Sequence, residues 1–170
     1  MRLIVLNGPP AIGKSTLAAR FAEDHPPALN LDIDRIRVLV GGWRERPRES
    51  GEAARALALA AARAHLTAGH DVVVPQLLAR PDFLLQLENL AHETGAALHE
   101  LVLWDSRDNV LNRFADRVPR PEHHETTAAE VGEFYDHLEA FLAERPRARV
   151  ITTAAGHVDE AYRAVLAALH

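Results

Sequence analysis

The residues with the clearest chemical meaning lie near the start of the chain, between two glycines. Gly8, Gly13, Lys14 and Ser15 match G-x-x-x-x-G-K-[ST], the spacing of a P-loop. Glycines let the backbone curl so that successive N–H groups converge on phosphate oxygens. Lys14 is the only lysine beside 18 arginines, and its flexible stem carries a compact charge that arginine's planar fork cannot replace. The motif therefore predicts phosphate binding.

The segments around this motif agree with it. An apolar run enters the glycine loop and a helical pattern over Lys14–Ala22 leaves it, so that the positive end of the helix dipole points at the phosphates. We expect ATP, because the only lysine is already used and the guanine-selective motif N-K-x-D cannot occur. Ser15 would supply a hydroxyl ligand to Mg²⁺. The predicted nucleotide contacts are Gly8, Ala11, Ile12, Gly13, Lys14, Ser15 and Thr16.

The whole chain is expected to form one α/β domain over residues 1–170. Its 48% hydrophobic and 25% charged residues are ordinary for a globular protein. Short apolar runs alternate with longer helical patterns, which indicates a mostly parallel, five-stranded sheet between two helical layers. The runs lack clean polar alternation, as in strands covered on both faces. The predicted strands are Arg2–Leu6, Leu29–Ile33, Asp71–Val74, His99–Trp104 and Arg149–Thr152.

Helical periodicity, proline starts and glycine stops define the helices between these strands. Two segments rich in arginine, proline and charge, Gly41–Gly51 and Val118–Glu125, are expected to be surface loops. The predicted helices are Lys14–Ala22, Glu52–Ala68, Pro81–Glu93, Asp108–Arg117, Thr127–Glu144 and Asp159–Leu169.

A second chemical motif, LDIDRIR, ends the second predicted strand. If the chain turns helical at Asp34, then Asp34 and Arg37 share one helix face. This edge of a parallel sheet borders the ligand crevice. A carboxylate there can accept the proton of an attacking hydroxyl, and the arginine can hold the acceptor. The alternative is that Asp34 is an exposed helix-capping residue.

With these two motifs the chain resembles small P-loop kinases. The group includes chloramphenicol phosphotransferase, zeta-type toxins and polynucleotide 5′-kinase, which are small AAA_33-type ATP-binding proteins. The resemblance is specific at Gly8–Thr16 and Asp32–Arg37. It implies a P-loop NTPase fold and transfer of the γ-phosphoryl group of ATP to a hydroxyl, with Asp34 as general base, Arg37 orienting the acceptor, and Asp32 holding Mg²⁺ through water.

The resemblance also implies a small lid after the fourth strand, over about residues 117–127. Arg113 and Arg117 are one helical turn apart, and Arg120 follows in the loop. Lid arginines would neutralise charge on the transferring phosphoryl group. We expect Arg113 to contact the nucleotide, and Arg117 and Arg120 to act in catalysis. Each could instead be a solvated surface charge.

The third strand departs from the group, because Pro75 and Gln76 stand where many relatives have an acidic residue. Asp105 resembles that acid in pattern, but it is expected at the neighbouring strand. By position, Gln76 and Arg80 are candidate acceptor contacts, although Gln76 could equally be a capping amide. Trp43 could flank the acceptor pocket or pack its own loop down.

Composition limits the partners. The net charge of −5 argues against coating long nucleic acid, so a small-molecule hydroxyl acceptor is expected, with an oligonucleotide 5′ end as an alternative. A nucleotide-binding regulatory protein with weak ATPase activity is the other alternative. Monomer and homodimer both fit the sequence.

Cysteine is absent, which excludes disulfides and thiolate chemistry. No apolar run reaches the roughly 18 residues of a membrane span, and no signal peptide is recognised, so a cytoplasmic protein is expected. The run Glu122–Glu125 contains two adjacent histidines without a spaced partner motif, and a solvated loop is a better interpretation than a zinc site.

Overall fold

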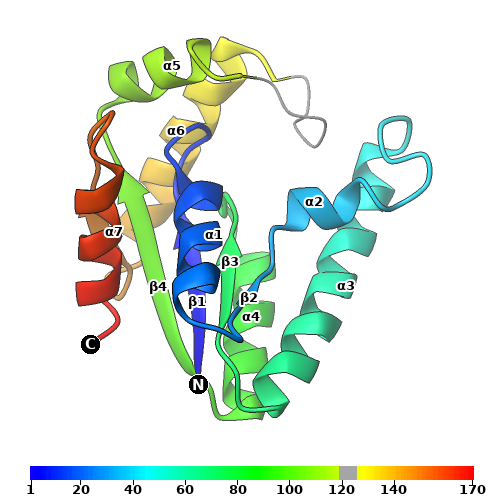
Figure 1. Ribbon diagram of the computed structural model, residues 1–170. Helices are drawn as coiled ribbons and strands as arrows, with labels where there is room; N and C mark the ends of the chain where they lie inside the picture. Colours follow the sequence, from blue (N-terminus) through cyan, green and yellow to red (C-terminus); the bar gives the residue numbers. More distant parts are fainter. Residues whose placement is uncertain (119–125) are drawn as a thin grey trace.

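Five parallel strands form the centre of the protein (Figure 1). The computed structural model describes residues 1–118 and 126–170. The strand order is β2-β3-β1-β4-β5, and every neighbouring pair is parallel. The predicted α/β fold class is confirmed. The strands are β1 Arg2–Asn7, β2 Leu29–Asn30, β3 Val72–Pro75, β4 Ala97–Trp104 and β5 Arg149–Thr152.

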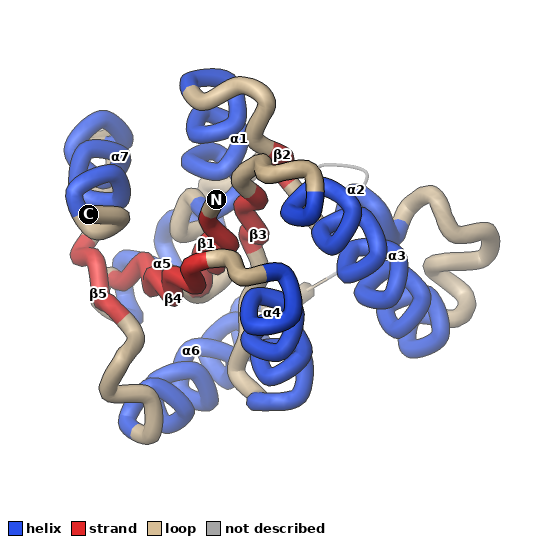
Figure 2. Tube along the Cα trace, turned by 90° about the horizontal axis from the view of Figure 1, so that it is seen from below, coloured by secondary structure: helices blue, strands red, loops and turns tan. Residues whose placement is uncertain are grey.

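Helices cover the sheet on both faces, which gives three layers. Figure 2 shows α1 and α7 on one side of the strands and α4 on the other, with α3 beside it. The helices are α1 Lys14–Asp24, α2 Ile33–Arg37, α3 Pro47–Thr67, α4 Pro81–Thr94, α5 Arg107–Ala115, α6 Ala128–Ala143 and α7 Val158–Ala167.

Strand β1 is buried on both faces. Its residues Leu3, Ile4, Val5 and Leu6 have no exposed surface. Successive side chains of a strand point to opposite faces, so Leu3 and Val5 pack with α3 and α4, whereas Ile4 and Leu6 pack with α1 and α7. The continuous apolar pattern of this run, without alternation, follows from burial on both sides.

The predicted loop over Gly41–Gly51 is wrong in its second half, because α3 begins at Pro47. Proline is well placed at a helix start, where its missing N–H costs nothing. Two ion pairs support this first part of the helix: Arg46 with Glu49 at 3.6 Å and Arg48 with Glu52 at 3.1 Å. The charges that suggested a loop are therefore the exposed face of a helix start.

Other boundaries differ by a few residues. The second predicted strand, Leu29–Ile33, is shorter: β2 ends at Asn30, because α2 already begins at Ile33 with Asp32 as its N-cap. Helix α5 ends at Ala115 and does not include Arg117. In the part of the chain that the structure describes, no helix is both long and apolar enough to cross a bilayer.

The glycine loop depends on a close approach between β1 and β4. Gly8 has φ +144°, and a Cβ atom there would lie 2.6 Å from the carbonyl oxygen of Leu103 on β4. Gly13 has φ +106° and is the N-cap of α1. Both values favour glycine. Gly8 therefore lets the chain turn against the neighbouring strand, and Gly13 lets it enter the helix.

We predict that Gly8→Ala destabilises the protein by about 2 kcal/mol, because the new methyl group meets backbone and the backbone conformation is strained. Chemical denaturation measures this change. Gly41→Ala is the control, since a Cβ atom at Gly41 has nothing within 4 Å, and it should leave the unfolding free energy almost unchanged. Equal stability of the two variants would contradict the prediction.

Candidate active site

A cavity of about 560 Å³ opens where β1 and β3 end, and we call it the P-loop cavity. It brings together both sequence motifs and the predicted lid. Its walls include Ala11, Gly13, Lys14, Ser15 and Thr16 from the loop, Asp32, Asp34 and Arg37 from around α2, Pro75, Gln76 and Leu77 after β3, Arg113 and Arg117 after β4, and Phe134 of α6.

Lys14 folds back on its own loop. Its Nζ donates hydrogen bonds of 2.8 Å to the carbonyl oxygens of Gly8 and Pro9. Gly8 thus contributes through its backbone and its close contact with β4, and it does not line the P-loop cavity. The ammonium is held in the middle of the loop, at the place where phosphate oxygens are expected.

Helix α2 positions Asp34. Asp32 is the N-cap of this helix, and its Oδ1 accepts a hydrogen bond of 3.2 Å from the backbone N–H of Asp34. Asp32 is only 8% exposed. The capping aspartate is therefore Asp32, and Asp34 lies in the first turn of the helix with its side chain lining the cavity.

Arg37 is held against the start of α3. Its Nε donates to Oγ of the buried Ser50 at 3.0 Å, and its Nη2 donates to the carbonyl oxygen of Pro47. Burial lowers the pKa of the Arg37 guanidinium, Asp34 raises it, and Arg55 lowers it again. The guanidinium is thus fixed beside Asp34 at the cavity wall.

Gln76 directly follows β3 and lines the P-loop cavity. Its backbone N–H donates to the carbonyl oxygen of Leu6 at 3.1 Å, which holds the chain close to β1 after β3 ends. Its side-chain Oε1 is buried and has no hydrogen-bond partner among the described residues. A buried acceptor without a donor is costly. Gln76 is therefore suited to accept a hydrogen bond from a ligand.

Asn7 is a site residue that the sequence analysis did not identify. It is fully buried. Its Oδ1 accepts from the backbone N–H groups of Gly8 and Leu78 at 2.7 and 2.9 Å, and its Nδ2 donates to the carbonyl oxygen of Leu78 at 2.9 Å. One side chain thereby connects the P-loop to the loop after β3. The signal in the sequence was a polar residue at the end of an apolar run.

Asp105 follows β4, the other neighbour of β1, as expected. Its Oδ2 accepts a hydrogen bond of 2.6 Å from Arg113, and its Oδ1 accepts from the backbone N–H of Ser106 and from Asn109, both at 2.7 Å. Both carboxylate oxygens are therefore engaged. Asp105 positions Arg113 at the cavity and does not stand in for the missing acid.

Two of the three arginines predicted for the lid region, Arg113 and Arg117, lie in the described part of the chain. Arg113, on α5, and Arg117, just beyond it, both line the P-loop cavity. Arg113 also donates to the carbonyl oxygen of Ile12 at 3.4 Å, so it connects α5 to the P-loop. Arg120 and the run Glu122–Glu125 lie outside the described residues.

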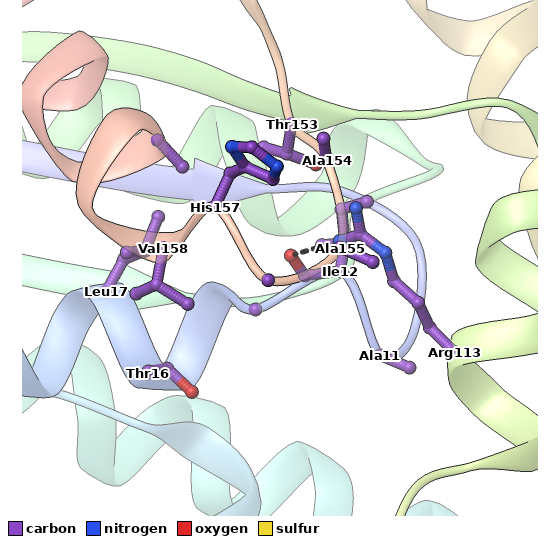
Figure 3. Close-up of a pocket in the computed structure, with 13 residues that line it drawn as sticks. Ala11, Ile12, Thr16, Leu17, Arg113, Thr153, Ala154, Ala155, His157 and Val158 are labelled. Atoms are coloured by element: carbon purple, nitrogen blue, oxygen red, sulfur yellow. Dashed lines mark hydrogen bonds between the residues drawn. The ribbon is translucent and has the colours of Figure 1, made fainter.

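A second cavity, of about 210 Å³, adjoins the P-loop on the side of β5 (Figure 3). We call it the β5–α7 cavity. Ile12 and Arg113 line it, together with small residues between β5 and α7 that the sequence analysis did not identify. The stretch, TTAAGHV, consists mostly of small residues, and its single histidine belongs to no motif. The residues in question are Thr153, Ala154, Ala155, Gly156, His157 and Val158.

Two predicted acceptor contacts lie elsewhere. Trp43 is in the connection between α2 and α3 and is not among the described residues that line these cavities; its ring packs against Arg44, 4.2 Å from the guanidinium carbon. Arg80 precedes α4 and lines a third cavity, of about 570 Å³. We call this one the α3–α6 cavity.

Comparison with known proteins agrees with this geometry. The family model AAA_33, described as an AAA domain, matches residues 3–141, which include both motifs and α5. The chain belongs to the AAA_33 family. No protein of curated function matches it.

Solved structures with the same fold include an enzyme and a resistance protein, both from bacteria. A gluconokinase from Sinorhizobium meliloti 1021 is 21% identical with a TM-score of 0.68, over 99% of this chain and 91% of that one. A tunicamycin resistance protein from Deinococcus radiodurans is also 21% identical, with a TM-score of 0.64, over 99% of this chain and 95% of that one. At these identities the likeness establishes the fold.

In this AAA_33 protein the charges around Lys14 oppose one another. Burial lowers the pKa of the Lys14 ammonium to about 8; Asp34 raises it, Arg117 lowers it and Asp32 raises it. The ammonium is thus protonated at neutral pH but close to losing its proton. No cluster of three or more His, Asp or Glu that could hold a metal ion occurs within residues 1–118 and 126–170.

We predict that ATP affinity falls as the pH rises above about 8. Bound phosphates favour the ammonium form, so the pKa of Lys14 is higher in the complex than in the free protein. Affinity is then complete below the free pKa of about 8 and decreases by up to about tenfold per pH unit above it. Calorimetric titration with ATP between about pH 7 and pH 9 measures the change.

Lys14→Arg is the matched control, because arginine keeps its charge over this range, and its ATP affinity, although weaker, should not change with pH. Titration near pH 8 in two buffers of different ionisation enthalpy should also reveal proton uptake by the wild type. A wild-type affinity that stays constant up to about pH 9 would overturn the assignment.

Proposed function

We propose that this protein is an ATP- and Mg²⁺-dependent kinase that transfers the γ-phosphoryl group to a hydroxyl of a small-molecule acceptor. One observation carries the proposal: Lys14 and Asp34 line the same cavity, and Asp34 is the strongest charge acting on the Lys14 ammonium. A carboxylate therefore lies close to the position of the phosphates. This is the arrangement that hydroxyl activation requires.

Different parts of this region bind different parts of the nucleotide. The backbone N–H groups of the loop and Lys14 bind the phosphates. The β5–α7 cavity, whose walls are mostly apolar but include His157 and Arg113, takes the base. Arg113 lines both cavities, so it lies between the base and the phosphates. Arg117 adds positive charge on the phosphate side.

Two side chains of the P-loop cavity could provide oxygen ligands for Mg²⁺, and the phosphates of the nucleotide would provide the others. The hydroxyl of Ser15 and the nearly buried carboxylate of Asp32 line the same cavity, and these oxygen ligands suit Mg²⁺. Ser15 would bind it directly and Asp32 through water, and the unpartnered Oε1 of Gln76 could accept from such a water. Bound there, Mg²⁺ neutralises charge on the β- and γ-phosphates.

The transfer step follows from this arrangement. Asp34 accepts the proton of the acceptor hydroxyl, whose oxygen forms a bond to the γ-phosphorus. The bond between that phosphorus and the oxygen bridging to the β-phosphate breaks, and ADP leaves with the electron pair. Lys14 and Arg117 stabilise the charge that develops on the phosphate oxygens. Arg37, fixed by Ser50 and Pro47, orients the acceptor.

We predict that Asp34→Asn binds ATP at least as tightly as the wild type but transfers phosphate about 10²- to 10⁴-fold more slowly, the usual contribution of a general base. Tighter ATP binding is expected because a negative charge beside the phosphates is removed. Asp108→Asn is the control, since Asp108 is an exposed aspartate of α5, and it should leave both quantities unchanged.

The measurement is ATP turnover with and without a panel of hydroxyl compounds that includes an oligonucleotide with a 5′-hydroxyl end. A kinase shows turnover that an acceptor stimulates, and the stimulation should be lost in Asp34→Asn. Transfer by Asp34→Asn at the wild-type rate would exclude Asp34 as the base. Wild-type turnover that no hydroxyl compound stimulates would favour a nucleotide-binding regulatory protein.

A further inference from the structure

The α3–α6 cavity has no role in the nucleotide site described above. It is about 570 Å³ in volume and lies between α3, the loop after β3, the start of α4 and α6. Five large apolar side chains line it: Leu77, Leu78, Phe83, Phe134 and Phe141. Its walls therefore combine large aliphatic and aromatic side chains with charged ones.

This cavity adjoins the P-loop cavity. Leu77 and Phe134 line both of them. Leu77 directly follows Gln76, whose unpartnered oxygen belongs to the P-loop cavity. A molecule with its hydroxyl beside Asp34 therefore needs only to pass these two side chains for its remainder to enter the α3–α6 cavity.

The charged residues around the cavity do not favour either an anionic or a cationic ligand. Arg55 and Arg80 line it with Asp82 and Glu144, so the two cations are balanced by two anions. The guanidinium carbon of Arg55 lies 5.7 Å from the centre of the Phe83 ring. Phe134 has 36% of its surface exposed. Exposed aromatic surface beside apolar walls gains free energy when a ring covers it.

We propose that the acceptor is an amphipathic alcohol whose aromatic or alicyclic part occupies the α3–α6 cavity while its hydroxyl points to Asp34. This inference rests on the proposed kinase function and names its substrate class. The five large apolar side chains favour a ring over a polyol or sugar acid, because a ring gains free energy by covering them.

Filling the cavity tests the proposal. Ala140 is an exposed residue of α6 that lines it, whereas Ala143, one turn further along the same helix, is exposed and does not line it. Ala140→Phe therefore adds a ring inside the cavity, and Ala143→Phe adds the same ring outside. Both positions are on the surface, so both variants should fold, which circular dichroism and ATP affinity check.

The probe is phenylpropanol, with glycerol for comparison, and binding is followed by saturation-transfer NMR on the carbon-bound protons of each alcohol with ADP and Mg²⁺ present. The wild type and Ala143→Phe should bind phenylpropanol more tightly than glycerol, and Ala140→Phe should bind it at least about tenfold more weakly. Equal binding by the two variants, or glycerol binding as tight as that of phenylpropanol, would overturn the inference.

Assaying both alcohols for phosphorylation separates this inference from the function on which it rests. Phosphorylated glycerol together with no phenylpropanol binding would keep the kinase and overturn the acceptor class. Phenylpropanol binding that Ala140→Phe blocks, with no alcohol phosphorylated, would keep the aromatic site and overturn the kinase. Phosphorylated phenylpropanol, lost in Ala140→Phe and kept in Ala143→Phe, supports both.

Discussion

Strand β1 has hydrogen-bonded neighbours on both sides and helices over both faces, and the site is built at its carboxyl end. It pairs with β3 on one side, where Leu6 is level with Pro75, and with β4 on the other, where Asn7 is level with Val102. Because all strands are parallel, the loops after β1, β3 and β4 leave the sheet at the same edge. The P-loop, Gln76 and Arg113 are therefore brought together by the pairing of one strand.

The same placement explains the charge balance of the P-loop cavity. Two carboxylates, Asp32 and Asp34, raise the pKa of Lys14, whereas its burial and Arg117 lower it. The carboxylates come from the start of α2, and the cations come from the P-loop and the segment after α5. Charges of both signs thus act on Lys14 from separate segments of the chain.

Local patterns in the sequence predicted much of this architecture. Apolar runs placed every strand in the right part of the chain, and the glycine spacing identified the P-loop, because both signals depend on near neighbours. The start of α3 at Pro47 was missed, since charged residues on an exposed helix face resemble those of a loop. The role of Asp32 as N-cap, with Asp34 in the first turn of α2, could not be predicted without knowing where β2 ends.

Contacts between distant segments could not be predicted. Leu78, one of the two partners of Asn7, lies 71 residues further along the chain, and nothing near Asn7 indicates it. The small residues of the β5–α7 cavity carry no chemical signal, and only the fold places them beside Ile12. Trp43 and Arg80 had suitable side chains, but the structure places neither on the wall of the P-loop cavity.

The buried amide of Asn7 also has a consequence for motion. Its three hydrogen bonds join the P-loop to the loop after β3, so neither loop can move away from the other without breaking them. The spacing of these two loops is thus set when the protein folds.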